Sequence, residues 1–210
     1  MDGKLSIASL ALLLCVSLSQ AGVSYIRWGR SKCPAGNIEL YKGYMTGQHV
    51  NGRGSGANFL CSPDQPKFLR GQPGFQEWAG QLYGVEFEKN VQMGGLFLAD
   101  NLPSGELHNQ DMLCVRCYVQ GASDVFMLPG RIDCYESGYD LLYRGFLVSD
   151  YHTNRASHEY VCLDEAPEGR KGGEGNSDQG FIYPVQYGCG SLPCDSYTDG
   201  IEATCAVCAY

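Results

Sequence analysis

The sequence lacks features that define several common functional classes. It contains no Asn-X-Ser/Thr acceptor, so N-glycosylation is not expected. Apolar residues at helical spacing are nearly absent, which argues against an all-helical fold. Basic residues are few, because 15 Lys and Arg stand against 23 Asp and Glu, for a net charge of -8. That balance argues against nucleic acid or an anionic membrane as a partner.

Long apolar runs are also missing beyond the N-terminus. Leu5–Leu18 is apolar, but it is shorter than the roughly 20 residues that a membrane-spanning helix needs. Lys4 before it and Ser19-Gln20-Ala21 after it complete the pattern of a secretory signal. We therefore expect a signal peptide over residues 1–21, a secreted extracellular protein and no membrane span.

Catalytic signatures are missing as well. The four histidines, His49, His108, His152 and His158, stand in none of the common hydrolase or metalloprotease motifs. We interpret a His–Asp pair such as His152 with Asp150 as a surface contact. The sequence therefore predicts a protein that is not an enzyme and has no catalytic, cofactor-binding or metal-binding residues.

Short runs rich in β-branched and aromatic residues dominate the chain, together with 28 glycines and 14 tyrosines. Gly, Pro, Asn, Asp or Ser bounds each run, which is the pattern of short antiparallel strands joined by turns. An all-β fold follows, with helix limited to a turn or two near Phe75–Gln81. The expected strands are Glu39–Tyr44, Leu82–Phe87, Leu113–Val119, Val125–Leu128, Leu141–Val148, Tyr160–Leu163 and Phe181–Tyr187.

Two segments have little to bury and are expected to be mobile loops. Gly47–Gly56 is glycine-rich and polar, and Glu165–Gln179 consists largely of Gly, Glu, Lys and Ser. We interpret the acidic cluster Glu165–Glu174 as a solvated face, because its carboxylates lack the alternation of a calcium loop. The acidic charge of the chain still leaves room for weak association with calcium or a mineral.

The cysteines repeat along the chain. Removing Cys15 with the signal leaves ten of the eleven, an even number suited to disulfides in an oxidising compartment. In each half, two cysteines 28 residues apart are followed by a C-x-x-C motif. These positions are Cys33, Cys61, Cys114 and Cys117 in the first half, and Cys134, Cys162, Cys205 and Cys208 in the second.

Other residues follow the same repeat. Gly29-Arg30 precedes Cys33 as Gly130-Arg131 precedes Cys134, Leu40–Tyr44 matches Leu142–Phe146, and Leu82–Phe87 matches Ile182–Tyr187. Because the matches keep one order, we expect two tandem duplicated, disulfide-rich subdomains at residues 22–121 and 122–210. Each subdomain is near the size at which a hydrophobic core alone is marginal, and cross-links would offset that.

The C-x-x-C pairs have three interpretations. A zinc ribbon usually spaces its pairs by roughly 15–20 residues, whereas 87 residues separate Cys117 from Cys205. A thioredoxin-like site needs the start of a helix, whereas Cys114 lies in a strand-like run. Disulfides are favoured, because the two cysteines of a C-x-x-C on a strand diverge and reach separate partners.

Requiring both halves to pair alike reduces the disulfide pairings to a few. One of these is a nested option, in which Cys33 joins Cys117, Cys61 joins Cys114, Cys134 joins Cys208 and Cys162 joins Cys205. Cys189 and Cys194 are left over, and they should close a small loop of their own.

Four motifs carry a resemblance to a known family. They are Trp28-Gly-Arg30, Gly56-Ala-Asn-Phe-Leu-Cys61, Leu107-His-Asn-Gln-Asp111 and Cys189-Gly-Ser-Leu-Pro-Cys194. Together they resemble the globular C-terminal domain of sponge short-chain (spongin-type) collagens, which is similar to the non-collagenous C-terminal domain of type IV collagen. The resemblance covers nearly the whole mature chain and implies a tandem duplicate with the nested bridges.

Two departures separate this chain from that family. The first half lacks the small-loop cysteine pair, and no Gly-X-Y run occurs anywhere. Because a collagen triple helix requires glycine at every third position, this chain cannot itself be a collagen.

The favoured function is that of a secreted, non-catalytic structural protein of the extracellular matrix. It would bind matrix proteins or itself through exposed β-edges or aromatic surface. Two alternatives stay open. One is an acidic organic-matrix protein of a mineralised skeleton. The other is a lectin-like recognition module, for which the loops Gly47–Gly56 and Asp150–His158 would form the contact surface.

Overall fold

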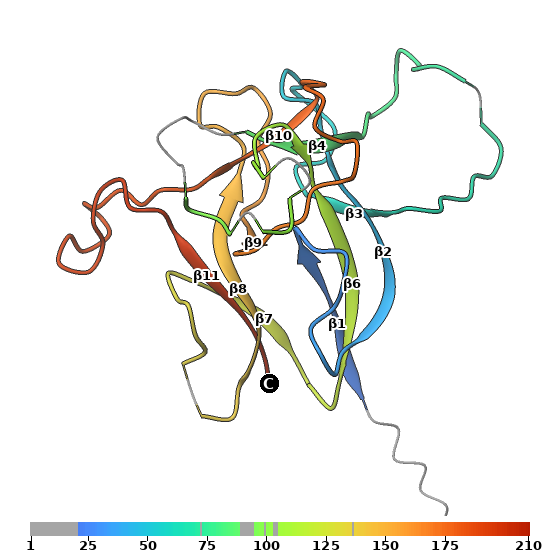
Figure 1. The fold of residues 1–210 in the computed structure, drawn as a ribbon. Helices are drawn as coiled ribbons and strands as arrows, with labels where there is room; N and C mark the ends of the chain where they lie inside the picture. The colour runs from blue at the N-terminus through green and yellow to red at the C-terminus, as the bar shows by residue number, and fades with distance from the viewer. Residues whose placement is uncertain (1–20, 72, 89–94, 99, 103–104, 136) are drawn as a thin grey trace, which may run out of the picture.

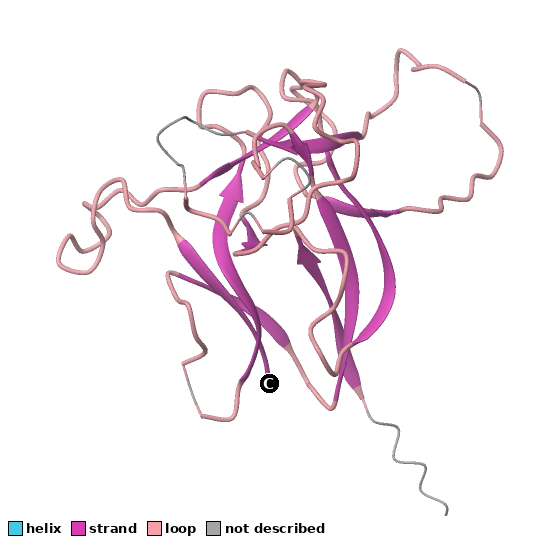
Figure 2. Cartoon of the chain, in the orientation of Figure 1, coloured by secondary structure: helices cyan, strands magenta, loops and turns pink. Residues whose placement is uncertain are grey.

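The computed structural model describes residues 21–71, 73–88, 95–98, 100–102, 105–135 and 137–210. Of the expected signal peptide, only Ala21 falls within these residues. The described residues form strands, turns and loops and no helix (Figure 2), so none of them forms a helix long and apolar enough to cross a membrane. The all-β class expected from the sequence is confirmed.

Eleven strands form in the described residues. They are β1 Gly22–Trp28, β2 Ile38–Gly47, β3 Leu60–Pro63, β4 Tyr83–Phe87, β5 Gln110–Asp111, β6 Leu113–Gln120, β7 Val125–Pro129, β8 Asp140–Ser149, β9 Val161–Asp164, β10 Gly180–Pro184 and β11 Thr204–Ala209. The second part of β2 shows the two-residue period of a half-buried strand, because Gly43, Met45 and Gly47 are buried while Tyr44 between them is exposed.

Each half contains a central strand with an antiparallel partner on either side (Figure 1). β6 lies between β1 and β2, and β2 also pairs with β3 and β4. In the second half, β11 lies between β7 and β8, and β8 also pairs with β9 and β10. The two halves therefore share one pattern of strand pairing.

Backbone hydrogen bonds outside the ladders follow the same pattern. The N–H of Met112 donates to the carbonyl of Val85 (3.0 Å), and the N–H of Ala203 donates to the carbonyl of Val185 (2.8 Å). Val85 and Val185 occupy the same place in the repeated sequence motifs. The tandem duplication that would explain this match stays a hypothesis.

Parallel pairing joins the two halves. β10 runs parallel to β4, with Gly180 opposite Val85, and β1 meets β9 where Trp28 lies opposite Leu163. The antiparallel strands expected from the sequence form within each half, and the sequence made no prediction for the strand pairs between the halves. Antiparallel neighbours can be read from short connecting turns, whereas these parallel partners come from segments far apart in the chain.

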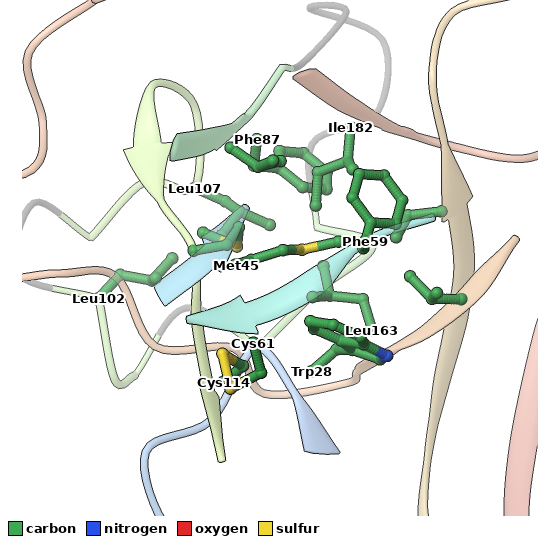
Figure 3. Packing of buried hydrophobic residues seen from close by; sticks show 14 residues of the cluster. Trp28, Met45, Phe59, Cys61, Phe87, Leu102, Leu107, Cys114, Leu163 and Ile182 are labelled. Carbon is green, nitrogen blue, oxygen red and sulfur yellow. A yellow bond between two sulfur atoms is a disulfide. The ribbon is translucent and has the colours of Figure 1, made fainter. Parts of the chain in front are cut away.

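Both halves contribute to each of two clusters of buried side chains. In the first cluster, Met45 of the first half packs with Leu163 and Ile182 of the second (Figure 3). In the second cluster, Tyr25 of the first half lies with Tyr143 of the second. The two expected subdomains therefore share their cores.

The helix predicted near Phe75–Gln81 does not form. A single turn is present instead, in which the N–H of Ala79 donates to the carbonyl of Gln76 (3.2 Å). Trp78 in this turn is 93% exposed. Short helices depend on packing of an apolar face. Here Phe75 contacts the ring of Tyr83 at 5.6 Å between centroids, but Trp78 is exposed, so no apolar face is buried and the prediction is wrong.

The segment Glu165–Gln179 crosses the first half of the molecule, and we call it the crossing segment. The N–H of Glu168 donates to the carbonyl of Gly29 (2.7 Å), and the N–H of Arg170 donates to the carbonyl of Asp111 (3.0 Å). The predicted loop is confirmed, and most of Arg170–Asp178 is exposed as expected, but the hydrogen bonds fix the segment to the other half, which was not expected. Its polar groups find partners in the other half, which local composition does not reveal.

Candidate functional site

The ten cysteines of residues 22–210 form five disulfides. They join Cys33 to Cys117, Cys61 to Cys114, Cys134 to Cys208, Cys162 to Cys205 and Cys189 to Cys194. These are the same pairs as those expected from the sequence and the resemblance. The bridges close separations of 84, 53, 74, 43 and 5 residues in that order.

The first C-x-x-C forms one disulfide on each face of β6. Cys114 belongs to the first buried cluster and Cys117 to the second. Because the two sulfur atoms leave the strand on different faces, Cys114 reaches Cys61 on β3 while Cys117 reaches Cys33 in the loop after β1. The two cysteines of this motif therefore form structural disulfides that join β6 to β3 and to the loop after β1.

The most exposed large apolar side chains among the described residues lie on one loop. This loop, Asp64–Leu82 without Gln72, which lies outside the described residues, connects β3 to β4 and projects away from the body of the molecule (Figure 1). Phe68 is 87% exposed, Leu69 100% and Trp78 93%. Exposed large apolar side chains on one loop indicate a candidate surface for binding a partner. We call Asp64–Leu82 the projecting loop.

Hydrogen bonds hold the projecting loop at both of its ends. The N–H of Asp64 donates to the carbonyl of Lys42 (3.1 Å), and the N–H of Gln81 donates to the Oγ of Ser55 (2.9 Å). Prolines and glycines recur between these ends, and they interrupt both strand and helix. The apolar side chains are thus presented by an irregular segment with fixed ends.

One stretch of the projecting loop combines apolar side chains with positive charge. Lys67 and Arg70 flank Phe68 and Leu69 in a chain whose net charge is -8, whereas Glu77 precedes Trp78. The stretch Lys67–Arg70 is complementary to an acidic surface, because opposite charges steer association and the apolar groups then gain by burial.

The two loops predicted as a recognition surface pack against each other. The backbone N–H of Gln48 donates to the Nε2 of His158 (3.1 Å), and the ring of Phe59 stacks on the imidazole at 4.3 Å. The Nδ1 of His158 lies 3.3 Å from a carboxylate oxygen of Asp150, and the two side chains are 0% and 3% exposed. Since Nε2 accepts a hydrogen bond, Nδ1 carries the ring proton and faces Asp150.

The predicted surface contact of His152 with Asp150 is therefore wrong, because Asp150 pairs with the buried His158. His152 lies against the ring of Tyr151, at 4.4 Å between centroids. The other two histidines lie elsewhere, His49 accepting from the N–H of Asn51 and His108 lying 3.4 Å from Glu88.

Arginines engage part of the predicted acidic face. Glu165 pairs with Arg144 at 3.0 Å, and Glu168 pairs with Arg30 at 3.2 Å. These two carboxylates thus form salt bridges that join the crossing segment to Arg144 and to Arg30. In the part of the chain that the structure describes, no group of three or more His, Cys, Asp or Glu side chains is placed to hold a metal ion.

A cleft of about 450 Å³ opens between β2, β4 and the crossing segment. Glu86 in its lining is 2% exposed, and its carboxylate accepts the N–H of Ser177 at 3.0 Å. Burial raises the pKa of Glu86, the Ser177 hydrogen bond opposes that rise, and the charge of Asp111 adds to it. Asp111 is itself bound by the Nε of Arg170 at 2.6 Å. Protein donors therefore already engage both carboxylates of the cleft.

No protein-family model matches this chain. The likeness to spongin-type and type IV collagen domains accordingly stays a resemblance carried by the four motifs.

Sequence reasoning missed the projecting loop as a candidate contact surface. Its signal was present, because Phe68, Leu69, Phe75 and Trp78 fall in a stretch with proline and glycine and no strand period. Apolar residues in such a stretch have no regular element to bury them. His158 carried no such signal, since Gln48 and Phe59, which contact its ring, lie far away in the chain.

Proposed function

We propose that this protein is a secreted, non-catalytic structural component of an extracellular matrix, and that it associates with copies of itself through the projecting loop. The observation that carries the proposal is the exposure of Phe68, Leu69 and Trp78, at 87%, 100% and 93%. Burying each such side chain in an interface contributes about 1.5–3 kcal/mol. Three of them give association a substantial driving force before its entropic cost.

Charge supports a second copy as the partner. The stretch Lys67–Arg70 of the loop is basic, while the whole chain has a net charge of -8. This basic stretch of one copy therefore meets a predominantly acidic surface on another. Attraction of this kind raises the rate of encounter and selects the partner.

The place of the loop in the fold supports the same partner. The projecting loop joins β3 to β4, and the crossing segment joins β9 to β10 in the second half. The crossing segment packs across the other half of its own chain, with hydrogen bonds to Gly29 and Asp111, whereas Phe68, Leu69 and Trp78 of the projecting loop are exposed. We infer that another chain supplies the surface for the projecting loop.

The disulfides support an extracellular setting. Five bridges in one chain are typical of proteins that mature in an oxidising compartment. A fold held by five cross-links suits a durable matrix component. The expected signal peptide and the resemblance to collagen-associated domains favour the same assignment.

Light scattering on the secreted protein over a range of concentrations tests the proposal. We expect the wild-type mass to rise above that of one chain as the concentration increases. A variant with Phe68→Ser, Leu69→Ser and Trp78→Ser should stay at the mass of one chain. A matched control, Tyr135→Ser with Tyr160→Ser, alters side chains that are 69% and 63% exposed elsewhere and should behave as wild type. A wild-type protein that remains a single chain at the highest concentration contradicts self-association.

A further inference from the structure

The small disulfide between Cys189 and Cys194 lies apart from the other four. It closes a separation of 5 residues on the loop between β10 and β11, which extends from the body of the molecule in orange-red (Figure 1). Cys194 is exposed and Cys189 is half-buried. Neither belongs to the two buried clusters.

The other four bridges are protected by burial. Each ends on a cysteine with no exposed surface, namely Cys114, Cys117, Cys205 or Cys208, all 0% exposed. Thiol–disulfide exchange requires a thiolate to reach one sulfur atom and the other sulfur to leave as a thiolate. An attack on any of these four bridges would either need access to a buried sulfur or leave a thiolate in the core, where a charge is costly.

The loop around the small disulfide is held by its own contacts. The N–H of Cys189 donates to a carboxylate oxygen of Asp199 (2.6 Å), and the rings of Tyr187 and Tyr197 meet at 4.9 Å. The N–H of Tyr197 also donates to the carbonyl of Pro193 (3.0 Å). Opening the disulfide therefore leaves the loop closed by hydrogen bonds and ring contact, and it leaves both cores intact.

The charged residues close to this disulfide in the sequence are all acidic. Asp195 follows Cys194 directly, and Asp199 and Glu202 lie in the same loop. The last basic residue of the chain is Lys171. A cationic thiol is therefore drawn to the bridge, whereas an anionic thiol is repelled.

We propose that Cys189–Cys194 is a thiol–disulfide exchange site for a positively charged thiol, either a small aminothiol or a protein cysteine flanked by lysine or arginine. The incoming thiolate attacks the Sγ of Cys194 and forms a new sulfur–sulfur bond with it. The bond to Cys189 breaks, and Cys189 leaves as a thiolate that takes a proton from water. One disulfide replaces another, so no oxidant or reductant is consumed. The site attaches the chain covalently to its partner, independently of the projecting loop.

Exchange kinetics on the intact secreted protein test this site. The folded protein is exposed at neutral pH to cysteamine or to glutathione, quenched with acid, alkylated and mapped by mass spectrometry. We expect the first adduct on Cys194 while the other eight bridged cysteines stay oxidised. Added salt should slow the reaction with cysteamine and accelerate the reaction with glutathione, because it screens attraction in one case and repulsion in the other.

Two variants sharpen the test. Asp195→Asn should slow the reaction with cysteamine about twofold, since one nearby charge is removed. Cys189→Ser with Cys194→Ser should abolish the adduct and keep a cooperative unfolding transition. A peptide with a lysine-flanked cysteine forms the same adduct if a protein is the partner, and reaction with cysteamine alone assigns a small aminothiol. Equal reaction at a second bridge, or salt effects of the same sign for both thiols, would overturn the proposal.

Discussion

At the scale of single residues, Tyr143 ties the two halves together. Its hydroxyl lies 3.2 Å from the carbonyl of Ile26 in the first half and 3.1 Å from that of Cys162 in the second. Its ring lies 6.4 Å from the ring of Tyr25. Burial raises the pKa of both tyrosines, that of Tyr25 to about 12. Both phenols are thus neutral in the physiological range and serve as hydrogen-bond donors.

Tyr143→Phe should destabilise the fold by about 1–2 kcal/mol, because the carbonyls of Ile26 and Cys162 lose the hydroxyl donor that they share. Tyr41 is the matched control, since it holds the same place in the repeated Leu-Tyr motif and is 38% exposed. Tyr41→Phe should change the free energy of unfolding by less than about 0.5 kcal/mol. Denaturant unfolding of the two variants measures the difference, and equal effects would contradict the role given to Tyr143.

Contacts that depend on the packing of distant segments could not be predicted from the sequence of a single loop. The cysteine pairs could be expected from the sequence, because a repeat and a resemblance restrict them. The partner of Asp150 could not, because His158 is brought to it by packing on Phe59 and by the N–H of Gln48. The local sequence shows that Asp150 is charged, but it does not show which side chain is packed against it.

At the scale of elements, two glycines let strands approach closely at matching places. A Cβ atom at Gly43 would lie 1.7 Å from the carbonyl oxygen of Ser62, and one at Gly145 would lie 1.7 Å from that of Leu163. These contacts bring β3 onto β2 and β9 onto β8. The first pairing positions Cys61 and the second positions Cys162 for their bridges.

Gly145→Ala should therefore destabilise the protein by about 1–3 kcal/mol, as expected for overpacking against a rigid backbone. Gly84 in β4 serves as the control, because nothing lies within 4 Å of a Cβ atom placed there. Gly84→Ala should be neutral or stabilising by up to about 1 kcal/mol. Thermal unfolding compares the two variants, and an unchanged midpoint for Gly145→Ala would show that β9 is not held as closely as described.

Strands rich in residues that favour β structure could be predicted from the sequence, whereas strands poor in such residues could not. The run Leu141–Val148 is rich in leucine and aromatic residues, and β8 covers Asp140–Ser149. β11 was not predicted as a strand, because Thr204–Ala209 is mainly alanine and cysteine, with weak intrinsic β preference. Its strand pairing comes from β7 and β8 on either side. The packing of the crossing segment was not predicted for the same reason, since its hydrogen-bond partners lie in the other half.

At the scale of the whole molecule, the disulfides fasten two halves that share their cores. The outer bridges close separations of 84 and 74 residues. In the chain-entropy model, each is worth about 4–5 kcal/mol when formed alone, and the nested inner bridges add less. That is a large part of the roughly 5–15 kcal/mol that stabilises a typical domain.

Full reduction and alkylation should therefore abolish the cooperative unfolding transition. Calorimetry of the reduced protein beside the oxidised protein measures this directly. Retention of a transition near that of the oxidised protein would show that packing alone holds the fold. Reduction limited to Cys189–Cys194 provides the control, because that bridge closes only 5 residues and should leave the transition in place.

Photo-crosslinking from the projecting loop tests the central claim, that this loop binds a second copy, most directly. A photoreactive phenylalanine replaces Phe68, and light and isotopically heavy copies of the protein are mixed before illumination. We predict cross-linked peptides that join light chains to heavy chains, and few from the same residue placed at Tyr135. Cross-links confined to light with light and heavy with heavy would contradict the account.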